Sequence, residues 1–315
     1  MNEEKRSGGA PKPDTALVVG LVNNMPDPAL ESTERQFREL LAAAAGPRRL
    51  RLRIFSIPER PRGETARAYV DEHYEDIGKL RAGELDGLIV TGAEPRMDVL
   101  TDEPYFPALA TLVDWADDHT TSTVWSCLAA HAAVFHLDGV KRERIPEKLF
   151  GVFDVEKVAN HPVLADVPAR WRMPHSRSNT LSEGALAAAG YQSLSRSSEA
   201  GADMFVKQRK SLFLFVQGHP EYDPGALLRE YQRDISRYLA GERETYPEMP
   251  AGYFDRETAV ALDAFRTRAL HQRDRALLGD FPAAAKERLV HAWSAPATRI
   301  YSNWLSYLAC HRRGA

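Results

Sequence analysis

Short apolar runs alternate with segments of helical periodicity up to about residue 240 of this 315-residue chain. Uninterrupted apolar runs of this kind are typical of strands buried on both faces of a parallel sheet, whereas residues 50–54 alternate apolar and charged residues like a half-buried strand. The expected strands cover residues 17–22, 50–54, 85–91, 121–125 and 211–216. The expected helices cover residues 28–45, 66–80, 105–118, 128–137 and 224–239. This order predicts an α/β fold, a mostly parallel sheet with helices on both faces.

The alternation ends near residue 240, and this change suggests three parts. We expect a flexible N-terminus at residues 1–14, a main domain at residues 15–245 and a helical C-terminal extension at residues 246–315. The N-terminal residues are polar and mixed in charge, with no apolar core like that of a secretory signal. In parallel sheets, reactive groups collect where strands end and helices begin, so we expect the chemistry in the main domain.

Charge and cysteine content exclude several classes of function. Forty-one basic and 44 acidic residues leave a net charge of −3, which gives no electrostatic reason to bind nucleic acid or an anionic membrane. The longest uncharged stretch, residues 120–137, contains too many Thr, Ser and His residues for a membrane span. Two cysteines cannot form a disulfide framework, which fits the cytoplasm. No HExxH or CxxC spacing occurs, so no metal is expected.

Cys127 stands between an expected strand and an expected helix, where the chain must turn sharply. A thiol at such a turn is exposed for reaction, and the helix N-terminus favours its thiolate. Small residues in the following segment, LAAHAAVFHL, allow close packing of that helix on the sheet. The pattern is that of a nucleophile elbow with cysteine in place of serine. An inert buried cysteine is the alternative interpretation, and it is the commoner case for free cysteines.

A thiolate nucleophile needs a base and a group that orients the base. The segment GHPEYD follows the expected strand at residues 211–216, so His219 should lie at the same sheet edge as Cys127. Glu221 lies two residues further on and can accept the second imidazole N–H. We therefore predict that Cys127, His219 and Glu221 form a catalytic triad.

Several motifs in one order identify a family resemblance. They are NMP at residues 24–26, ESTERQF at 31–37, DGLIVTGA at 86–93, DHTTSTVWSC at 118–127, EKL at 147–149, PHSR at 174–177, GHPEYD at 218–223 and RD at 233–234. With these motifs the chain resembles the homoserine O-acyltransferases of methionine biosynthesis, of the homoserine O-succinyltransferase type. The resemblance implies a class I glutamine-amidotransferase-like fold and covers residues 17–246, with a weaker match at residues 302–307.

The resemblance implies acyl transfer from an acyl-CoA co-substrate, with no bound cofactor. Cys127 would attack the thioester, and the acyl group would then pass to the hydroxyl of L-homoserine. His219 would act as the base and Glu221 would orient it. The resemblance also suggests small-molecule partners only and a homodimer.

The resemblance further assigns substrate-binding positions. Arg233 matches the arginine that holds the carboxylate of the amino acid, a role that suits guanidinium geometry. Ser176 and Lys148 match positions implicated in binding at the active site. In the alternative interpretation, Lys148 and Arg233 are ordinary surface partners of Glu147 and Asp234, and Ser176 is a turn residue.

The loop after DGLIVTGA departs from the family pattern. Members typically continue with Pro, Leu and then Gly or Glu, whereas this chain has Glu94, Pro95 and Arg96. In the family this loop supplies an N–H to the oxyanion, which Pro95 cannot do, so the N–H of Leu128 would carry more of that function. Arg96 could pair with the free carboxylate of a succinyl group, which an acetyl group lacks. We therefore expect succinyl-CoA rather than acetyl-CoA as the donor.

Other functions remain open on the sequence alone. The acceptor could be serine or another hydroxy amino acid, because the loop and Leu128 place the chain in a divergent branch. A glutamine-amidotransferase-like hydrolase would use the same triad. A non-catalytic binding protein is disfavoured, because it would not need Cys127, His219 and Glu221 together.

Overall fold

The computed structural model describes residues 16–93, 95–97 and 99–312, so the expected flexible N-terminus at residues 1–14 lies outside the described residues. Within this part of the chain, nine strands form one sheet in the order β2-β1-β3-β4-β9-β8-β7-β5-β6. The parallel half contains β1 (Leu17–Val22), β2 (Leu50–Phe55), β3 (Gly87–Val90), β4 (Ser122–Ser126) and β9 (Leu212–Val216). The antiparallel half contains β5 (Glu143–Lys157), β6 (Arg170–Thr180), β7 (Gln192–Ser197) and β8 (Gly201–Gln208).

The strands of the parallel half are the ones that the sequence predicts, and their ends agree to within two residues. The antiparallel half differs from the prediction, in which residues 140–210 contain no strand. Polar residues alternate with apolar ones in much of this region, and the first part of β5 is largely exposed. An antiparallel sheet can leave one face in water, so its strands do not read as continuous apolar runs.

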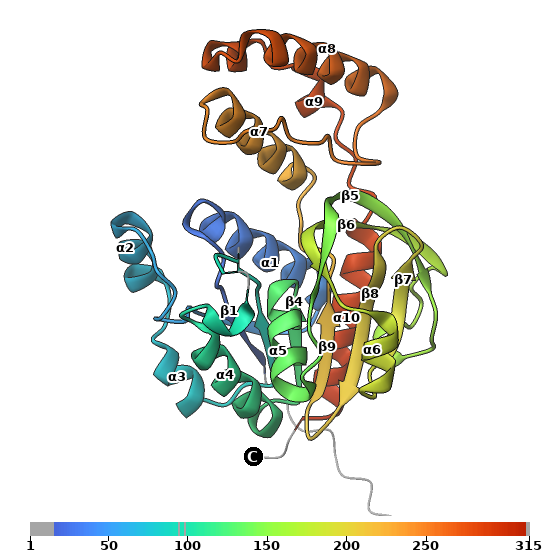
Figure 1. The fold of residues 1–315 in the computed structure, drawn as a ribbon. Helices are drawn as coiled ribbons and strands as arrows, with labels where there is room; N and C mark the ends of the chain where they lie inside the picture. The colour runs from blue at the N-terminus through green and yellow to red at the C-terminus, as the bar shows by residue number, and fades with distance from the viewer. Residues whose placement is uncertain (1–15, 94, 98, 313–315) are drawn as a thin grey trace, which may run out of the picture.

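Helices cover both faces of the sheet, as predicted (Figure 1). On one face, α1 (Leu30–Ala45) and α10 (Ser294–Cys310) share an apolar core with β1 and β9. On the other face, α4 (Phe106–His119), α5 (Leu128–Asp138) and α6 (Glu183–Ala188) pack on β3 and β9. The short helices η1 (Asp27–Ala29), η2 (Leu100–Asp102) and η3 (Pro162–Leu164) lie in the connections.

One predicted helix was wrong, because residues 66–80 do not form a single helix. The structure has α2 (Glu64–His73) and α3 (Ile77–Ala82) instead. Tyr74 ends α2 in an extended conformation and is buried. The Asp76 carboxylate then accepts a hydrogen bond from the Gly78 N–H at 2.8 Å and starts α3. A side-chain cap of this kind begins a new helix, although the apolar periodicity of the segment indicates one continuous helix.

The segment after residue 245 forms two different packing arrangements. α8 (Arg256–Gln272), η4 (Arg275–Asp280) and α9 (Ala284–Glu287) share a separate apolar core with α7 (Ala226–Leu239), drawn above the sheet in Figure 1. In contrast, α10 returns to the sheet, where the Trp304 indole donates a 3.0 Å hydrogen bond to Ser122 Oγ. The domain boundary between residues 245 and 246 stays a prediction. The segment after this boundary packs in two places, partly against α7 and partly against the sheet.

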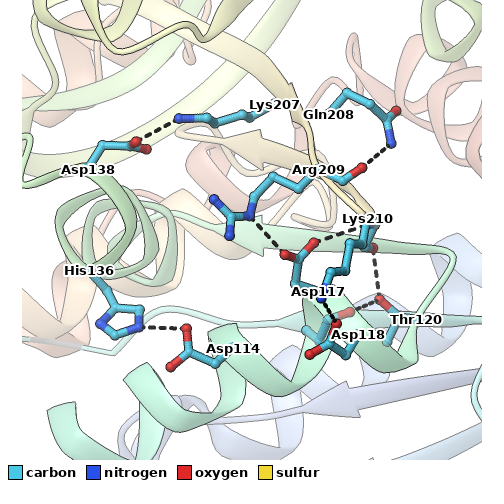
Figure 2. Close-up of polar contacts among 12 residues, drawn as sticks. Asp114, Asp117, Asp118, Thr120, His136, Asp138, Lys207, Gln208, Arg209 and Lys210 are labelled. Carbon is cyan, nitrogen blue, oxygen red and sulfur yellow. Dashed lines mark hydrogen bonds and ion pairs between the residues drawn. The ribbon is translucent and has the colours of Figure 1, made fainter.

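Ion pairs fasten the β8–β9 turn to the helices beside it (Figure 2). Arg209 Nε lies 3.0 Å from Asp117 of α4, and Lys207 Nζ lies 2.7 Å from Asp138 at the end of α5. His136 of α5 lies 2.9 Å from Asp114 of α4. These pairs lie at the opposite end of the parallel strands from Cys127, so they hold the helices without taking part in the site. Among the described residues, no helix is both long enough and apolar enough to cross a membrane.

Candidate active site

Cys127 occupies the sharp turn between β4 and α5, as the sequence predicts. Its backbone has φ 51° and ψ −115°, a conformation that a residue with a side chain rarely adopts. A strained conformation of this kind persists only where neighbouring structure enforces it. Here the Cys127 N–H donates a 2.7 Å hydrogen bond to the carbonyl of Val216, the last residue of β9. The turn therefore fixes the thiol at the carboxyl edge of the sheet.

His219 and Glu221 lie beside Cys127. His219 Nδ1 is 2.8 Å from Glu221 Oε1, and Cys127 lies close enough to the His219 ring to influence its pKa. Both His219 and Glu221 are buried. Burial opposes the charge of the ring, but Glu221 and Cys127 outweigh it and raise the pKa of His219 to about 10. The arrangement favours a protonated imidazole next to the sulfur, as a thiolate nucleophile requires.

The loop that carries His219 is held from two sides. The His219 N–H donates a 2.8 Å hydrogen bond to the Pro174 carbonyl of β6. The Tyr222 ring stacks on the His219 ring with centroids 4.3 Å apart. The Tyr222 carbonyl in turn accepts a 2.7 Å hydrogen bond from the indole of Trp293, which is fully buried. The sequence analysis did not identify Trp293, because it lies 71 residues away from its partner.

A buried polar network lies behind the same loop. His175 Nε2 is 3.4 Å from Asp203 Oδ1, and both side chains are fully buried. Burial lowers the pKa of His175, with Asp203 acting in the opposite direction. A Cβ atom on Gly218 would lie 2.8 Å from Asp203 Oδ1 and 2.5 Å from the Met173 side chain. Glycine at residue 218 therefore allows the His219 loop to pack directly on this network.

Gly92 leaves open the space in front of the helix that follows Cys127. A Cβ atom on Gly92 would lie 2.9 Å from the backbone nitrogen of Leu128. Leu128 is the first residue of α5, and the first N–H groups of a helix have no partner within it. An N–H at this position can bind an oxyanion formed next to the Cys127 sulfur.

The structure places Arg96 on the exposed surface of the loop after β3. The Arg96 and Met97 N–H groups both donate to the buried carboxylate of Glu103, at 2.6 Å and 2.9 Å. Both of these N–H groups are therefore occupied by Glu103. Within the described part of the chain, the Arg96 guanidinium forms no hydrogen bond or ion pair, and no contact with Cys127 is present.

The other predicted substrate-binding residues meet at a carboxylate that the sequence analysis missed. Glu230 Oε1 lies 2.5 Å from Lys148 Nζ, 2.7 Å from Ser176 Oγ and 3.5 Å from Arg233 Nη2. Arg233 also contacts Asp234, at 2.9 Å from its Nε atom. Glu230 lies one helical turn before Arg233 on α7, and this spacing was the available signal in the sequence.

Charge complementarity sets the state of Glu230. Burial would raise the pKa of its carboxyl, but Lys148, Ser176 and Arg233 lower it overall. The Glu230 charge also contributes to the raised pKa of Tyr222, as does Cys127. Tyr222, which stacks on His219, is thus influenced by both groups of charges. The described residues contain no group of three or more His, Cys, Asp or Glu side chains that could hold a metal ion.

Comparisons with known proteins show the family of this chain. Residues 7–314 match the family model for homoserine O-succinyltransferase. The chain is 49% identical over 294 residues to a homoserine O-succinyltransferase of Rhodopseudomonas palustris, covering 93% of this chain and 88% of that protein. It is 50% identical over 295 residues to the protein of that name from Methylorubrum extorquens, covering 93% of this chain and 87% of the relative.

Solved structures support the fold. A glutamine amidotransferase from Methylobacillus flagellatus superposes with a TM-score of 0.52, covering 96% of this chain and 97% of its own, at 14% sequence identity. This confirms the predicted glutamine-amidotransferase-like fold. The family match over nearly the whole chain also confirms the resemblance identified from the motifs. The chain belongs to the homoserine O-succinyltransferase family.

Proposed function

We propose that this protein transfers a succinyl group from succinyl-CoA to the hydroxyl of L-homoserine through an acyl-enzyme on Cys127. Family membership supports the overall reaction. The observation that carries the mechanism is the 2.8 Å contact of His219 with Glu221 next to Cys127 at the carboxyl edge of the sheet.

The first half-reaction forms the acyl-enzyme. The Cys127 thiolate attacks the thioester carbonyl, and the Leu128 N–H binds the oxyanion that develops. The carbon–sulfur bond to CoA then breaks, and the departing CoA thiolate takes the proton from the His219 imidazolium. Glu221 keeps the ring oriented during this transfer, because it holds the Nδ1 proton.

The second half-reaction passes the acyl group to the amino acid. Neutral His219 removes the proton from the homoserine hydroxyl as its oxygen attacks the acyl carbonyl. The bond to the Cys127 sulfur breaks, which regenerates the thiolate and the imidazolium. The enzyme is then in the same protonation state as before the first half-reaction.

The Glu230 cluster supplies groups that match an amino acid. Arg233 is suited to the α-carboxylate, since a guanidinium can bind both carboxylate oxygens. Glu230 is suited to the α-ammonium group, because its carboxylate is partly exposed and Lys148, Ser176 and Arg233 lower its pKa. Ser176 and Lys148 position Glu230 through their contacts with Oε1.

The test is to mix the protein with succinyl-CoA in the absence of an acceptor and to analyse the Cys127 peptide by mass spectrometry. The wild-type peptide should gain the mass of one succinyl group. In His219→Ala the same mass increase should appear at a much lower rate. Cys127→Ser should form no thioester. The absence of any acylated peptide would contradict the mechanism.

The acceptor is tested by adding L-homoserine or L-serine to the isolated acyl-enzyme. We expect rapid loss of the acyl group and formation of O-succinyl-L-homoserine. Faster release by L-serine would instead assign serine as the acceptor. Release of ammonia from glutamine without acyl-CoA would favour the hydrolase alternative.

We also propose a homodimer in the cytoplasm, with residues 15–245 as the catalytic domain and residues 246–315 as an extension. Light scattering during size-exclusion chromatography should give twice the 35.2 kDa chain mass. A monomeric mass would contradict the dimer. Cell fractionation should recover the protein with the cytoplasm rather than with the membrane.

A further inference from the structure

Arg60 is a buried cation with unused hydrogen-bond donors. It follows β2 and is 3% exposed. Within the described residues, its Nε and Nη1 atoms have no hydrogen-bond partner. The guanidinium carbon lies 5.5 Å from the centre of the Tyr105 ring, which covers one side of it. Burial lowers the pKa of Arg60, and neighbouring Arg96 and Arg62 add to this effect, whereas Tyr105 and the buried carboxylate of Glu103 act in the opposite direction. An unpaired buried guanidinium is unfavourable unless an anion completes its contacts.

Arg60 borders a cavity of about 540 Å³ at the end of β2, and this volume is in the range of small-molecule sites. Arg62 and Arg67 also line the cavity. Arg62 is held by the Asn23 carbonyl at 3.1 Å and Ser56 Oγ at 2.9 Å, and its buried Nε has no partner among the described residues.

Acidic residues also line this cavity, but they do not neutralise Arg60. Glu75 uses both carboxylate oxygens to bind Arg53, at 2.9 Å and 2.7 Å. Asp76 accepts the N–H of Gly78 at the start of α3. Glu59 and Asp71 are exposed, so their charges are solvated. Arg60 is therefore the cavity cation whose charge is most completely removed from water.

The cavity lies at the same edge of the sheet as Cys127, because β2 and β4 run parallel within it. β1 and β3 separate these two strands, so the strand ends are roughly 14 Å apart. The pantetheine arm of CoA contains cysteamine, β-alanine and pantoate units, comparable to four or five extended residues, or roughly 15 Å. An acyl-CoA whose thioester carbonyl lies at Cys127 can thus bring its phosphates to the cavity. The carboxylate of the succinyl group is too close to the thioester to reach that far.

We propose that Arg60 is a phosphate-binding residue for the nucleotide part of the acyl-CoA donor, which occupies the cavity between β2, α2 and α3. The proposal rests on the proposed function for its ligand. Arg60 would thus bind the nucleotide part of the donor, whereas Arg96 is predicted to bind the succinyl carboxylate. A planar guanidinium can bind two phosphate oxygens together through Nη2 and one of the two unpartnered donors, Nε or Nη1.

The experiment measures equilibrium binding of adenosine 3′,5′-bisphosphate and of CoA by calorimetry. We expect Arg60→Met to weaken both by about tenfold or more. Arg60→Lys should fall between Arg60→Met and the wild type, because it keeps the charge without the paired donors. Arg51→Met is the matched control, since Arg51 is exposed on β2, the strand that precedes Arg60, and does not line the cavity. Its affinity should equal that of the wild type.

Thermal unfolding and a truncated donor separate this role from a structural one. Without ligand, Arg60→Met should unfold near the wild-type temperature, because the cost of burying the guanidinium offsets its attraction to Glu103. The KM for succinyl-CoA should rise about tenfold in Arg60→Met, whereas that for succinyl-N-acetylcysteamine should not change. A lower unfolding temperature, an equal rise in both KM values, or unchanged bisphosphate binding would overturn the proposal.

Failure of the proposed function would give a different result. If the wild type binds the bisphosphate through Arg60 but forms no acyl-enzyme, the binding site stands and the acyl-transfer mechanism fails. If acyl transfer proceeds while Arg60→Met binds the bisphosphate as tightly as the wild type, the mechanism stands and this site fails.

Discussion

The Nδ1 atom of His219 lies 2.8 Å from Oε1 of Glu221, two residues along the chain, and both side chains are buried. The Glu221 carboxylate raises the pKa of His219 and so favours a charged imidazole beside Cys127. A substitution of Glu221 alone therefore tests its role while His219 stays in place.

Glu221→Gln should reduce kcat about 10²- to 10⁴-fold, because the amide can no longer hold the imidazolium that forms in each half-reaction. It should also change the pH dependence of stability. The pKa of His219 is raised from 6.5 to about 10, so its proton stabilises the folded state fully below pH 6.5. That stabilisation is lost as the pH rises toward 10.

Urea unfolding between pH 6 and 10 measures this effect. The free energy of unfolding should fall with rising pH in the wild type and fall less steeply in Glu221→Gln. Glu242→Gln, an exposed substitution near the end of α7, serves as the control for loss of a carboxylate. Parallel pH curves for the wild type and Glu221→Gln would show that Glu221 does not hold the His219 proton.

Gly92→Ala should lower kcat about 10²-fold, because the new Cβ lies 2.9 Å from the Leu128 nitrogen and covers the proposed oxyanion site. The KM for succinyl-CoA should change less than kcat does. Gly279→Ala is the matched control, since its Cβ meets nothing within 4 Å among the described residues. Steady-state rates that are equal for the two variants would argue against Leu128 as an oxyanion donor.

Glu230→Gln should raise the KM for L-homoserine by about tenfold, because the charge that pairs with the substrate ammonium group is lost. The KM for succinyl-CoA should stay the same, since the donor does not use this cluster. Steady-state kinetics with each substrate varied in turn provide the measurement. An equal effect on both KM values would indicate that Glu230 supports the fold and does not bind the amino acid.

Arg96→Ala should raise the KM for succinyl-CoA about tenfold and leave that for acetyl-CoA unchanged, because only the succinyl group carries a second carboxylate. Met97→Ala changes the neighbouring exposed residue without altering charge and is the control. A preference for acetyl-CoA that Arg96→Ala does not affect would rule out this role.

Trp293→Phe should lower kcat about tenfold and destabilise the protein by about 1–3 kcal/mol, because the Tyr222 carbonyl loses its 2.7 Å indole donor. The His219 ring stacks on Tyr222, so the pH profile of kcat should shift as well. Phe281→Leu, in the same apolar core but away from Tyr222, tests for a general packing effect. A loss of stability with an unchanged pH profile would assign Trp293 to packing alone.

The sequence by itself determined the parallel half of the sheet and the position of Cys127 at its edge. Continuous apolar runs identify strands buried on both faces, and the turn after β4 follows from where one run stops. The pairing of His219 with Glu221 could also be predicted, because it depends on two residues at a short spacing. The motifs were sufficient to place the chain in its family.

The tertiary structure decided which distant groups complete the site. Polar residues interrupt the antiparallel strands, and the first part of β5 is largely exposed, so no continuous apolar run identifies them. Glu230 and Trp293 act through partners brought close only by the packing of α7 and of the segment before α10. The unused donors of Arg60 follow from its burial against Tyr105. Burial and pairing between residues far apart in the chain are properties of the packed molecule, which local patterns in the sequence do not encode.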